Sequence, residues 1–223
     1  MTFSLLGRCP RDDLLGVAIA SSSPAVAARC AYARPGTGVA VSQNVTDPRL
    51  GPALLDALDA GVSAAAAVDR VAATAAHCEH RQLGAVDARG GVGAFTGPRA
   101  LGRHGHRAGT DCLAAGNLLA HEDVLEGLID EFERASGEHL GSRLVRALSA
   151  GRERSPVRSA GLLVAGWVPW PVADLRVDWH DDPVDELWEL WQLWQPQLDD
   201  YVTRALDPER APAFGVAGDE RRQ

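Results

Sequence analysis

Short apolar segments predict the strands of this chain. Residues 3–8 and 14–20 are two such segments joined by a polar turn, and the second is apolar throughout, which is typical of a strand covered on both faces. A Gly-rich turn at Arg89–Gly91 predicts a β-hairpin over residues 82–97. Further strands are predicted at 37–42, 159–165 and 173–179.

Between these strands, apolar positions recur every three or four residues, which is the period of an amphipathic helix. Ser63 is the predicted N-cap of the second helix, and Asp182-Pro183 is the predicted start of the last one. Pro196 is expected to kink or break that last helix. The predicted helices lie near residues 50–58, 64–75, 124–132, 140–148 and 183–201, whereas the Gly- and His-rich residues 98–116 are predicted to form a loop.

This order of elements favours one fold class. Strands, a helix pair, strands, a helix pair, strands and a helix follow one another, whereas a doubly wound sheet would need strict alternation of strands and helices. We therefore predict an α+β fold, a four-layer αββα sandwich with two stacked and mainly antiparallel sheets. Residues 1–206 form the single predicted domain, and residues 207–223 an irregular C-terminal tail.

Composition excludes several kinds of chemistry. All 22 basic residues are arginine, so Schiff-base and P-loop chemistry that depends on lysine is excluded. The net charge of −8 and the lack of a basic run argue against nucleic-acid partners. There is no apolar run long enough for a membrane span and no signal peptide, and four separated cysteines indicate reduced thiols. We therefore expect a cytoplasmic protein that makes no contact with membranes or nucleic acid.

Metal and cofactor chemistry also finds little support in the sequence. His104-x-His106 and His77-Cys78-x-His80 are the two clusters of metal-ligating residue types. Neither is followed by further ligands at the spacing of a zinc site. We expect no metal and no cofactor.

Thr2 is the principal candidate for chemistry. Bacterial methionine aminopeptidase generally removes Met1 when a small residue follows it. The mature chain would then begin with a threonine that carries a hydroxyl nucleophile and a free α-amine base on one residue. That amine has an ordinary pKa of roughly 8, so a part of it is neutral near pH 7. Many chains begin Met-Thr without any such role, so Thr2 needs support from the residues around it.

The hairpin predicted for residues 3–20 places polar residues beside Thr2. If its strands pair about a turn near residues 11–12, opposing residue numbers sum to about 23, and Thr2 lies opposite Ser21. Ser22 and Ser23 follow directly. These serines are candidates for proton relay (Ser21) and substrate binding (Ser22, Ser23). The alternative is that Ser-Ser-Ser-Pro is a turn that ends a strand.

Three further polar residues at element ends are candidate substrate contacts. Asn44 could donate a hydrogen bond to an oxyanion, or belong to the turn before the helix that Asp47 caps. Asn117 could bind substrate, or act as a cap or turn residue. Arg158 could bind an anionic group, or be a solvated surface residue.

All six tryptophans fall in the last third of the chain. Trp188, Trp191 and Trp194 share the last predicted helix and fit either a large core or a subunit interface, where tryptophan is enriched. We expect a homo-oligomer.

Long motifs resemble a known family. MTFSLLGRCPRDDLLGVAIASSSPAVAARC, GVAVSQNVTDPRLGPALLDALDAG, RQLGAVDARG, AAGNLLA and DLRVDWHDDP resemble, in order and spacing, the bacterial family called domain of unknown function 1028. That family is classed with the N-terminal-nucleophile (Ntn) hydrolases. The resemblance implies an αββα fold and an N-terminal nucleophile at Thr2. Many Ntn hydrolases place a lysine near the nucleophile, and this chain would need Arg29 or Arg34, or serines and water, instead.

Three functional hypotheses follow. The first is an amidohydrolase in which Thr2 attacks the carbonyl of a non-peptide C–N bond in a small molecule. The second is a non-catalytic small-molecule-binding or scaffold protein that retains the fold. The third is a degraded proteasome-like peptidase, which the absence of lysine disfavours.

Overall fold

The computed structural model describes residues 1–152, 156–216 and 219, and within them ten strands form two antiparallel sheets. The six-stranded sheet has the order β10-β9-β2-β1-β8-β7 and the four-stranded sheet the order β3-β4-β5-β6. The strands are β1 (Thr2–Cys9), β2 (Leu14–Ser21), β3 (Ala31–Arg34), β4 (Gly38–Asn44), β5 (Arg81–Asp87), β6 (Val92–Thr96), β7 (Gly105–Gly109), β8 (Cys112–Asn117), β9 (Ser159–Ala165) and β10 (Pro171–Val177).

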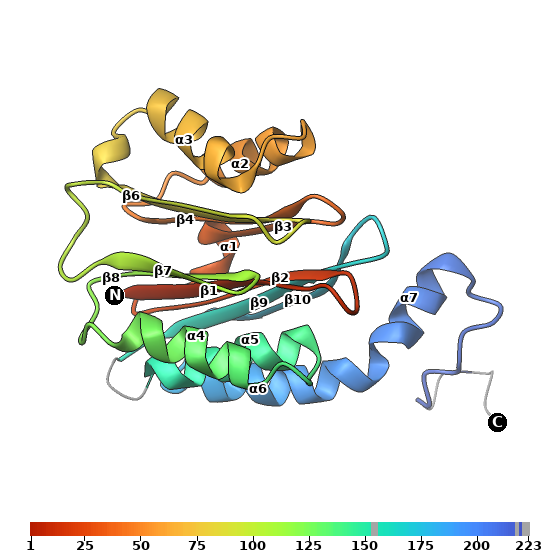
Figure 1. Cartoon of the computed structure of the whole chain (residues 1–223). Coiled ribbons are helices and arrows are strands. Elements are labelled where there is room, and N and C mark those ends of the chain that lie inside the picture. Colours follow the sequence, from red (N-terminus) through yellow and green to blue (C-terminus); the bar gives the residue numbers. More distant parts are fainter. Residues whose placement is uncertain (153–155, 217–218, 220–223) are drawn as a thin grey trace.

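Helices cover the outer faces of both sheets (Figure 1). On the four-stranded sheet lie α2 (Leu50–Asp59) and α3 (Ala64–Thr74), and on the six-stranded sheet lie α4 (Val124–Arg134), α5 (Leu140–Arg152) and α6 (Pro183–Trp194). The short α1 (Ala27–Cys30) lies between the sheets, and α7 (Leu198–Leu206) extends beyond the sandwich. The predicted αββα sandwich with two antiparallel sheets is confirmed.

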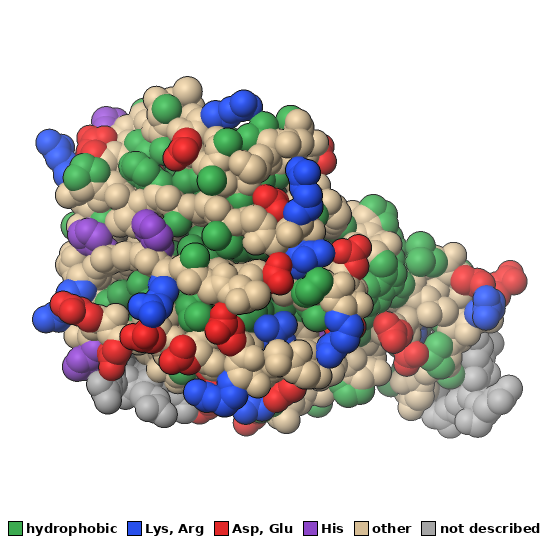
Figure 2. All heavy atoms as spheres, viewed as in Figure 1, with side chains coloured by type: hydrophobic (Ala, Val, Ile, Leu, Met, Phe, Trp, Pro, Cys, Tyr) green, Lys and Arg blue, Asp and Glu red, His purple; other side chains and the backbone are tan. Residues whose placement is uncertain are grey.

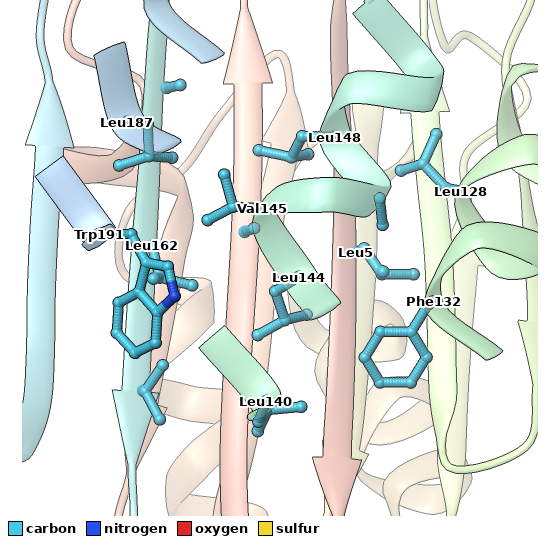
Figure 3. Packing of buried hydrophobic residues seen from close by; sticks show 14 of the residues in the cluster. Leu5, Leu128, Phe132, Leu140, Leu144, Val145, Leu148, Leu162, Leu187 and Trp191 are labelled. Atoms are coloured by element: carbon cyan, nitrogen blue, oxygen red, sulfur yellow. The ribbon is translucent and has the colours of Figure 1, made fainter. Parts of the chain in front are cut away.

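Three apolar clusters fill the spaces between the four layers. The largest packs α4, α5 and α6 on the six-stranded sheet and includes the fully buried Phe132 and Trp191 (Figure 3). A second lies between the sheets, and a third lies under α2 and α3. Strand β1 contributes to the first two because its side chains alternate: Phe3 and Leu5 face the helices, whereas Leu6 faces the other sheet.

Several predicted helix ends and turns lie where the sequence placed them. The Ser63 hydroxyl accepts a hydrogen bond from the Ala66 N–H at 3.4 Å, as expected of an N-cap. At Pro196, α6 gives way to the short 3₁₀ turn η2 (Gln195–Gln197) before α7 begins, because proline cannot continue the backbone ladder. Gly90 has a φ of 87° in the turn of the predicted hairpin.

The prediction of a loop over residues 98–116 is wrong. This segment contains β7 and most of β8, and β8 is buried along its whole length. The signal was missed because four of the six residues in CLAAGN are Ala, Gly or Asn, which are depleted in strands. Two shorter elements also went unpredicted, α1 and β3, each of four residues.

The tryptophans of α6 pack on their own chain. Trp191 is fully buried, and its Nε1 donates to Ser142 Oγ at 2.9 Å. Trp194 donates to the Val172 carbonyl at 3.0 Å and stacks on Tyr201 at 4.8 Å between centroids. Core packing therefore accounts for these side chains.

In the described part of the chain, no helix is long and apolar enough to cross a membrane.

Candidate functional site

A row of four polar residues crosses the six-stranded sheet at one end. Thr2 on β1 pairs with Ser21 on β2 and with Asn117 on β8, and Ser21 also pairs with Ser159 on β9. Directly opposed residues of neighbouring strands project to the same face of a sheet. That face is the one toward the four-stranded sheet, because Ser4, two residues after Thr2, bonds to Gln43 of β4. Four polar side chains therefore line one end of the space between the sheets.

The hairpin arithmetic is confirmed residue by residue. The register of β1 and β2 runs from Thr2↔Ser21 to Cys9↔Leu14, and every pair sums to 23. The hydroxyls of Thr2 and Ser21 lie 2.9 Å apart. The candidate nucleophile is thus half-buried and in hydrogen-bond contact with a second hydroxyl that is almost fully buried.

Ser21 is the centre of the local hydrogen-bond network. Its Oγ donates to the Met1 carbonyl at 2.9 Å, lies 3.0 Å from Ser23 Oγ and accepts from the Ser23 N–H at 3.2 Å. The exposed Ser22 accepts from the Met1 amine at 2.8 Å. Burial lowers the pKa of this amine from its ordinary value. The three serines therefore surround the chain start, as the sequence predicted.

Arg29 lies at the far end of this hydroxyl chain. Its guanidinium donates to Ser23 Oγ at 2.7 Å and to the carbonyls of Pro24 and Ala25. Among the described residues it forms no ion pair within 4.0 Å. Arg34, the other candidate charge, instead pairs with Asp56 at 2.7 Å on α2. Arg29 is therefore the arginine connected to Thr2, through Ser23 and Ser21.

Buried amides connect the row to the other sheet. Asn117 Nδ2 donates to Gln82 Oε1 at 3.2 Å, and Gln43 Nε2 donates to the same oxygen at 2.8 Å. Gln43 in turn accepts from Ser4 Oγ at 2.9 Å. Gln82 Nε2 faces the carbonyls of Gly105 and Gly116 at 2.9 and 3.0 Å. A satisfied buried network of this kind fixes side-chain positions, so Asn117 is held directly opposite Thr2.

Asn44 and Arg158 occupy different positions from these. Asn44 lies on β4 opposite Arg81 with a φ of 70°, its Nδ2 donates to the His80 carbonyl, and its Oδ1 accepts from the Leu101 N–H. Its amide thus holds two loops, and Asn117 is the asparagine next to Thr2. The Arg158 N–H donates to the Ser21 carbonyl at 2.7 Å, while its guanidinium pairs with Asp181. Arg158 therefore borders the row through its backbone.

Sequence reasoning did not single out Ser4 or Gln82, and Ser159 joins the row beside the predicted Arg158. Ser159 Oγ donates to the Ser23 carbonyl at 2.7 Å and accepts from the Val26 N–H at 3.1 Å, so it fixes the turn that carries the serines. A polar residue inside an otherwise apolar strand was the available signal for Ser4 and Gln82, because a buried polar group needs a buried partner.

The row can support nucleophilic chemistry by hydroxyl groups. The Thr2 hydroxyl contacts the Ser21 hydroxyl, and the Asn117 carboxamide lies opposite Thr2. The Arg29 guanidinium is connected to this pair through Ser23. Over the described residues, no group of three or more His, Cys, Asp or Glu side chains is arranged to hold a metal ion.

The family model named DUF1028, a family of unknown function, matches residues 2–187. Protein SPO2555 from Silicibacter pomeroyi, a DUF1028 protein of known crystal structure, is 31% identical in sequence, and the match covers 86% of this chain and 88% of that one with a TM-score of 0.81. The Anbu (Gly-1) mutant from Hyphomicrobium sp. strain MC1 is 12% identical over 97% of this chain and 100% of its own, with a TM-score of 0.41. Similarity this low indicates nothing about chemistry. No curated protein matches the chain. Because the family model spans most of the sequence, the chain belongs to DUF1028.

Proposed function

We propose that this protein is an N-terminal-nucleophile hydrolase that cleaves a non-peptide amide C–N bond of a small molecule, with Thr2 as nucleophile after removal of Met1. The observation that carries the proposal is the 2.9 Å contact between the hydroxyls of Thr2 and Ser21 at the end of the inter-sheet space. The chain also belongs to DUF1028, and the resemblance to this family implies an N-terminal nucleophile at Thr2.

Removal of Met1 would change the direction of the hydrogen bonds at Ser21. A hydroxyl has one proton, and that of Ser21 goes to the Met1 carbonyl, so Thr2 donates to Ser21. Without this carbonyl, the Ser21 proton is free to turn toward Thr2 Oγ1. Thr2 Oγ1 then accepts, and its own proton is free to pass to the α-amine created on the same residue.

In the reaction, Thr2 Oγ1 would attack the substrate carbonyl while its proton moves to the α-amine. The C–N bond would break as the amine returns that proton to the leaving nitrogen, and water would then hydrolyse the ester. The second N–H of the Asn117 amide, opposite Thr2, is the candidate donor to the oxyanion. Arg29 would favour the neutral α-amine, because a nearby cation disfavours the protonated form of a base.

In this proposal, Ser22 and Ser23 would contact the substrate. The four cysteines are free, which agrees with a reducing, cytoplasmic location.

Exposed Trp179 and Leu193, with 63% and 67% of their surfaces accessible, are the candidate contacts of a homo-oligomer. Size-exclusion chromatography with light scattering would give the subunit count.

Intact mass and covalent labelling test the proposal without a known substrate. The intact mass should correspond to a chain that lacks Met1. A β-lactone should then acylate Thr2, as located by peptide mass spectrometry. Thr2→Val keeps the side-chain shape and a small residue behind Met1 but removes the hydroxyl, so it should not be labelled, whereas Thr2→Ser should be.

Retained Met1, or equal labelling of the parent chain and Thr2→Val, would refute the nucleophile. The non-catalytic alternative would then stand. If labelling occurs, turnover of a panel of small amides, with Thr2→Val as the blank, gives the substrate class.

A further inference from the structure

A pocket of about 430 Å³ lies at the end of β1 opposite to Thr2. The turn after β1, the β7–β8 turn and the facing parts of α4 and α5 line it. Strand β1 has eight residues, and at roughly 3.3 Å per residue its ends lie about 23 Å apart. This pocket is therefore separate from the polar row at Thr2.

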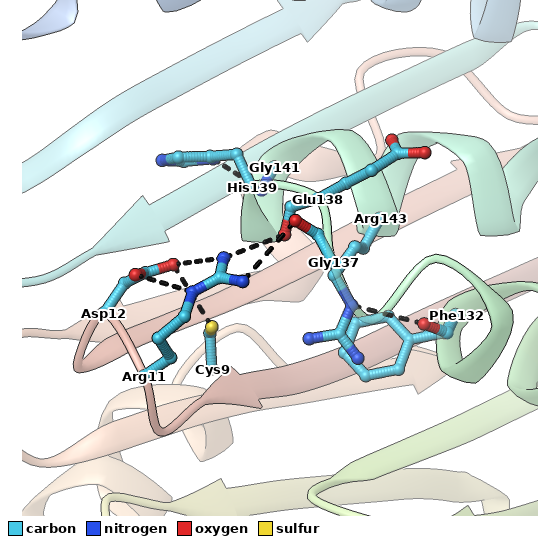
Figure 4. Close-up of polar contacts among 9 residues, drawn as sticks. All are labelled: Cys9, Arg11, Asp12, Phe132, Gly137, Glu138, His139, Gly141 and Arg143. Atoms are coloured by element: carbon cyan, nitrogen blue, oxygen red, sulfur yellow. Dashed lines mark hydrogen bonds and ion pairs between the residues drawn. The ribbon is translucent and has the colours of Figure 1, made fainter.

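Arg143 of α5 forms part of the pocket wall, although only 7% of its surface is exposed. Its guanidinium lies over the Phe132 ring, 3.8 Å from the centroid, and its Nε donates to the Phe132 carbonyl at 3.2 Å (Figure 4). Within the described ranges this is its one side-chain hydrogen bond, and no carboxylate lies within 4.0 Å. Since a guanidinium has five N–H donors, the four on its terminal nitrogens are unused.

The other charges around the pocket are matched or held elsewhere. Arg8 pairs with Asp111 at 3.4 Å, and its Nε is buried without a hydrogen-bond partner. Arg11 is held by Asp12 at 2.8 Å (Figure 4). Glu133 is exposed and accepts from the Thr110 N–H at 2.9 Å. Among the described residues, Arg143 is thus a cation of this pocket that has no carboxylate within 4.0 Å.

Little of Arg143 is exposed, and the pocket beside it leaves room for an anionic partner of its guanidinium. The planar fork of a guanidinium matches the two oxygens of a carboxylate. Because Phe132 and its own Nε bond fix the guanidinium plane, little side-chain entropy remains to be lost on binding. The geometry points to a binding site for a small organic carboxylate, whose two oxygens accept from the terminal nitrogens of Arg143.

Glu133 lines the same pocket and opposes an anion there. Its removal therefore offers a test that leaves the core intact. Glu133→Gln retains the acceptor for the Thr110 N–H and removes the repelling charge. Glu126→Gln is the matched control, because Glu126 is also exposed on α4 but pairs with Arg107 outside the pocket.

The experiment measures the melting temperature of the full chain against propionate, inorganic phosphate and NaCl at equal ionic strength. Propionate should raise the melting temperature saturably beyond NaCl, because a ligand that binds the native state stabilises it. Glu133→Gln should lower the apparent Kd at least threefold, and Glu126→Gln should not. Arg143→Met should abolish the response, and if that variant does not fold, the two glutamate variants still decide.

Three results would overturn the site: a propionate response no larger than that of NaCl, a response to phosphate alone, or equal behaviour of the two glutamate variants. Thr2→Val should bind propionate like the parent chain. The outcome is therefore independent of the function proposed for Thr2.

Discussion

Thr2 and Ser21 face each other across the β1–β2 pair with their hydroxyl oxygens 2.9 Å apart, and Ser21 alone of the two also bonds to the Met1 carbonyl. Processing of the chain start would therefore alter the partner of the candidate nucleophile as well as create its base. The rate at which a β-lactone acylates Thr2 is a direct measure of how this contact affects the nucleophile.

Acylation of the processed chain should rise with pH and level off above the pKa of the Thr2 α-amine. Burial lowers the pKa of the Met1 amine, and Thr2 lies one residue further into the sheet. The midpoint should therefore lie below the ordinary value of roughly 8, since only the neutral amine accepts the proton. A midpoint at or above that value would contradict the amine as a desolvated base.

Ser21→Ala should slow the acylation of Thr2. A hydrogen bond to a group that develops charge contributes about 1.5–3 kcal/mol, which is roughly a 10- to 150-fold change in rate. Ser136→Ala is the control, because Ser136 is exposed and lies at the end of the sheet opposite to Thr2. Equal rates for the two variants would remove Ser21 from the mechanism.

Arg29→Gln should shift the midpoint of the pH profile upward and slow acylation near pH 7. The reason is that loss of the cation lets the α-amine hold its proton to higher pH. Arg34→Gln removes the same charge from a residue that pairs with Asp56, and it should leave the profile unchanged. Identical shifts in both variants would indicate an effect of net charge alone.

Local patterns in the sequence sufficed to predict part of this site. Hairpin symmetry placed Ser21 opposite Thr2 because the pairing of two consecutive strands is set by their turn. The neighbour on the other side, β8, is separated from β1 by about a hundred residues, so no local pattern could show that Asn117 lies beside Thr2. The partners of Gln82 depend on the packing of one sheet on the other, so the sequence could mark Gln82 as polar but could not show which residues it contacts.

Two glycine-to-alanine changes should have opposite effects on stability. A Cβ at Gly141 would lie 2.5 Å from the ring of the fully buried Trp191, so Gly141→Ala should lower the free energy of unfolding by roughly 1–3 kcal/mol. At Gly127 in α4, the nearest atom would be 3.9 Å away. Gly127→Ala should therefore raise the free energy of unfolding by roughly 0.5–1 kcal/mol. Urea titration checks both, and a stable Gly141→Ala would show that Trp191 can shift.

Gln82→Met should lower the free energy of unfolding by at least about 2 kcal/mol, because it leaves buried donors of Gln43 and Asn117 without their shared acceptor. For a domain of this size, that corresponds to a fall of roughly 4–8 °C in Tm. Gln197→Met is the control, since Gln197 is exposed and, among the described residues, its side chain bonds to the Leu193 carbonyl one helical turn away and to no other group. The free Asn117 amide should also lose its fixed orientation, so acylation of Thr2 should slow in Gln82→Met under conditions where the variant is fully folded. Unchanged acylation in the folded variant would show that Asn117 does not hold the oxyanion.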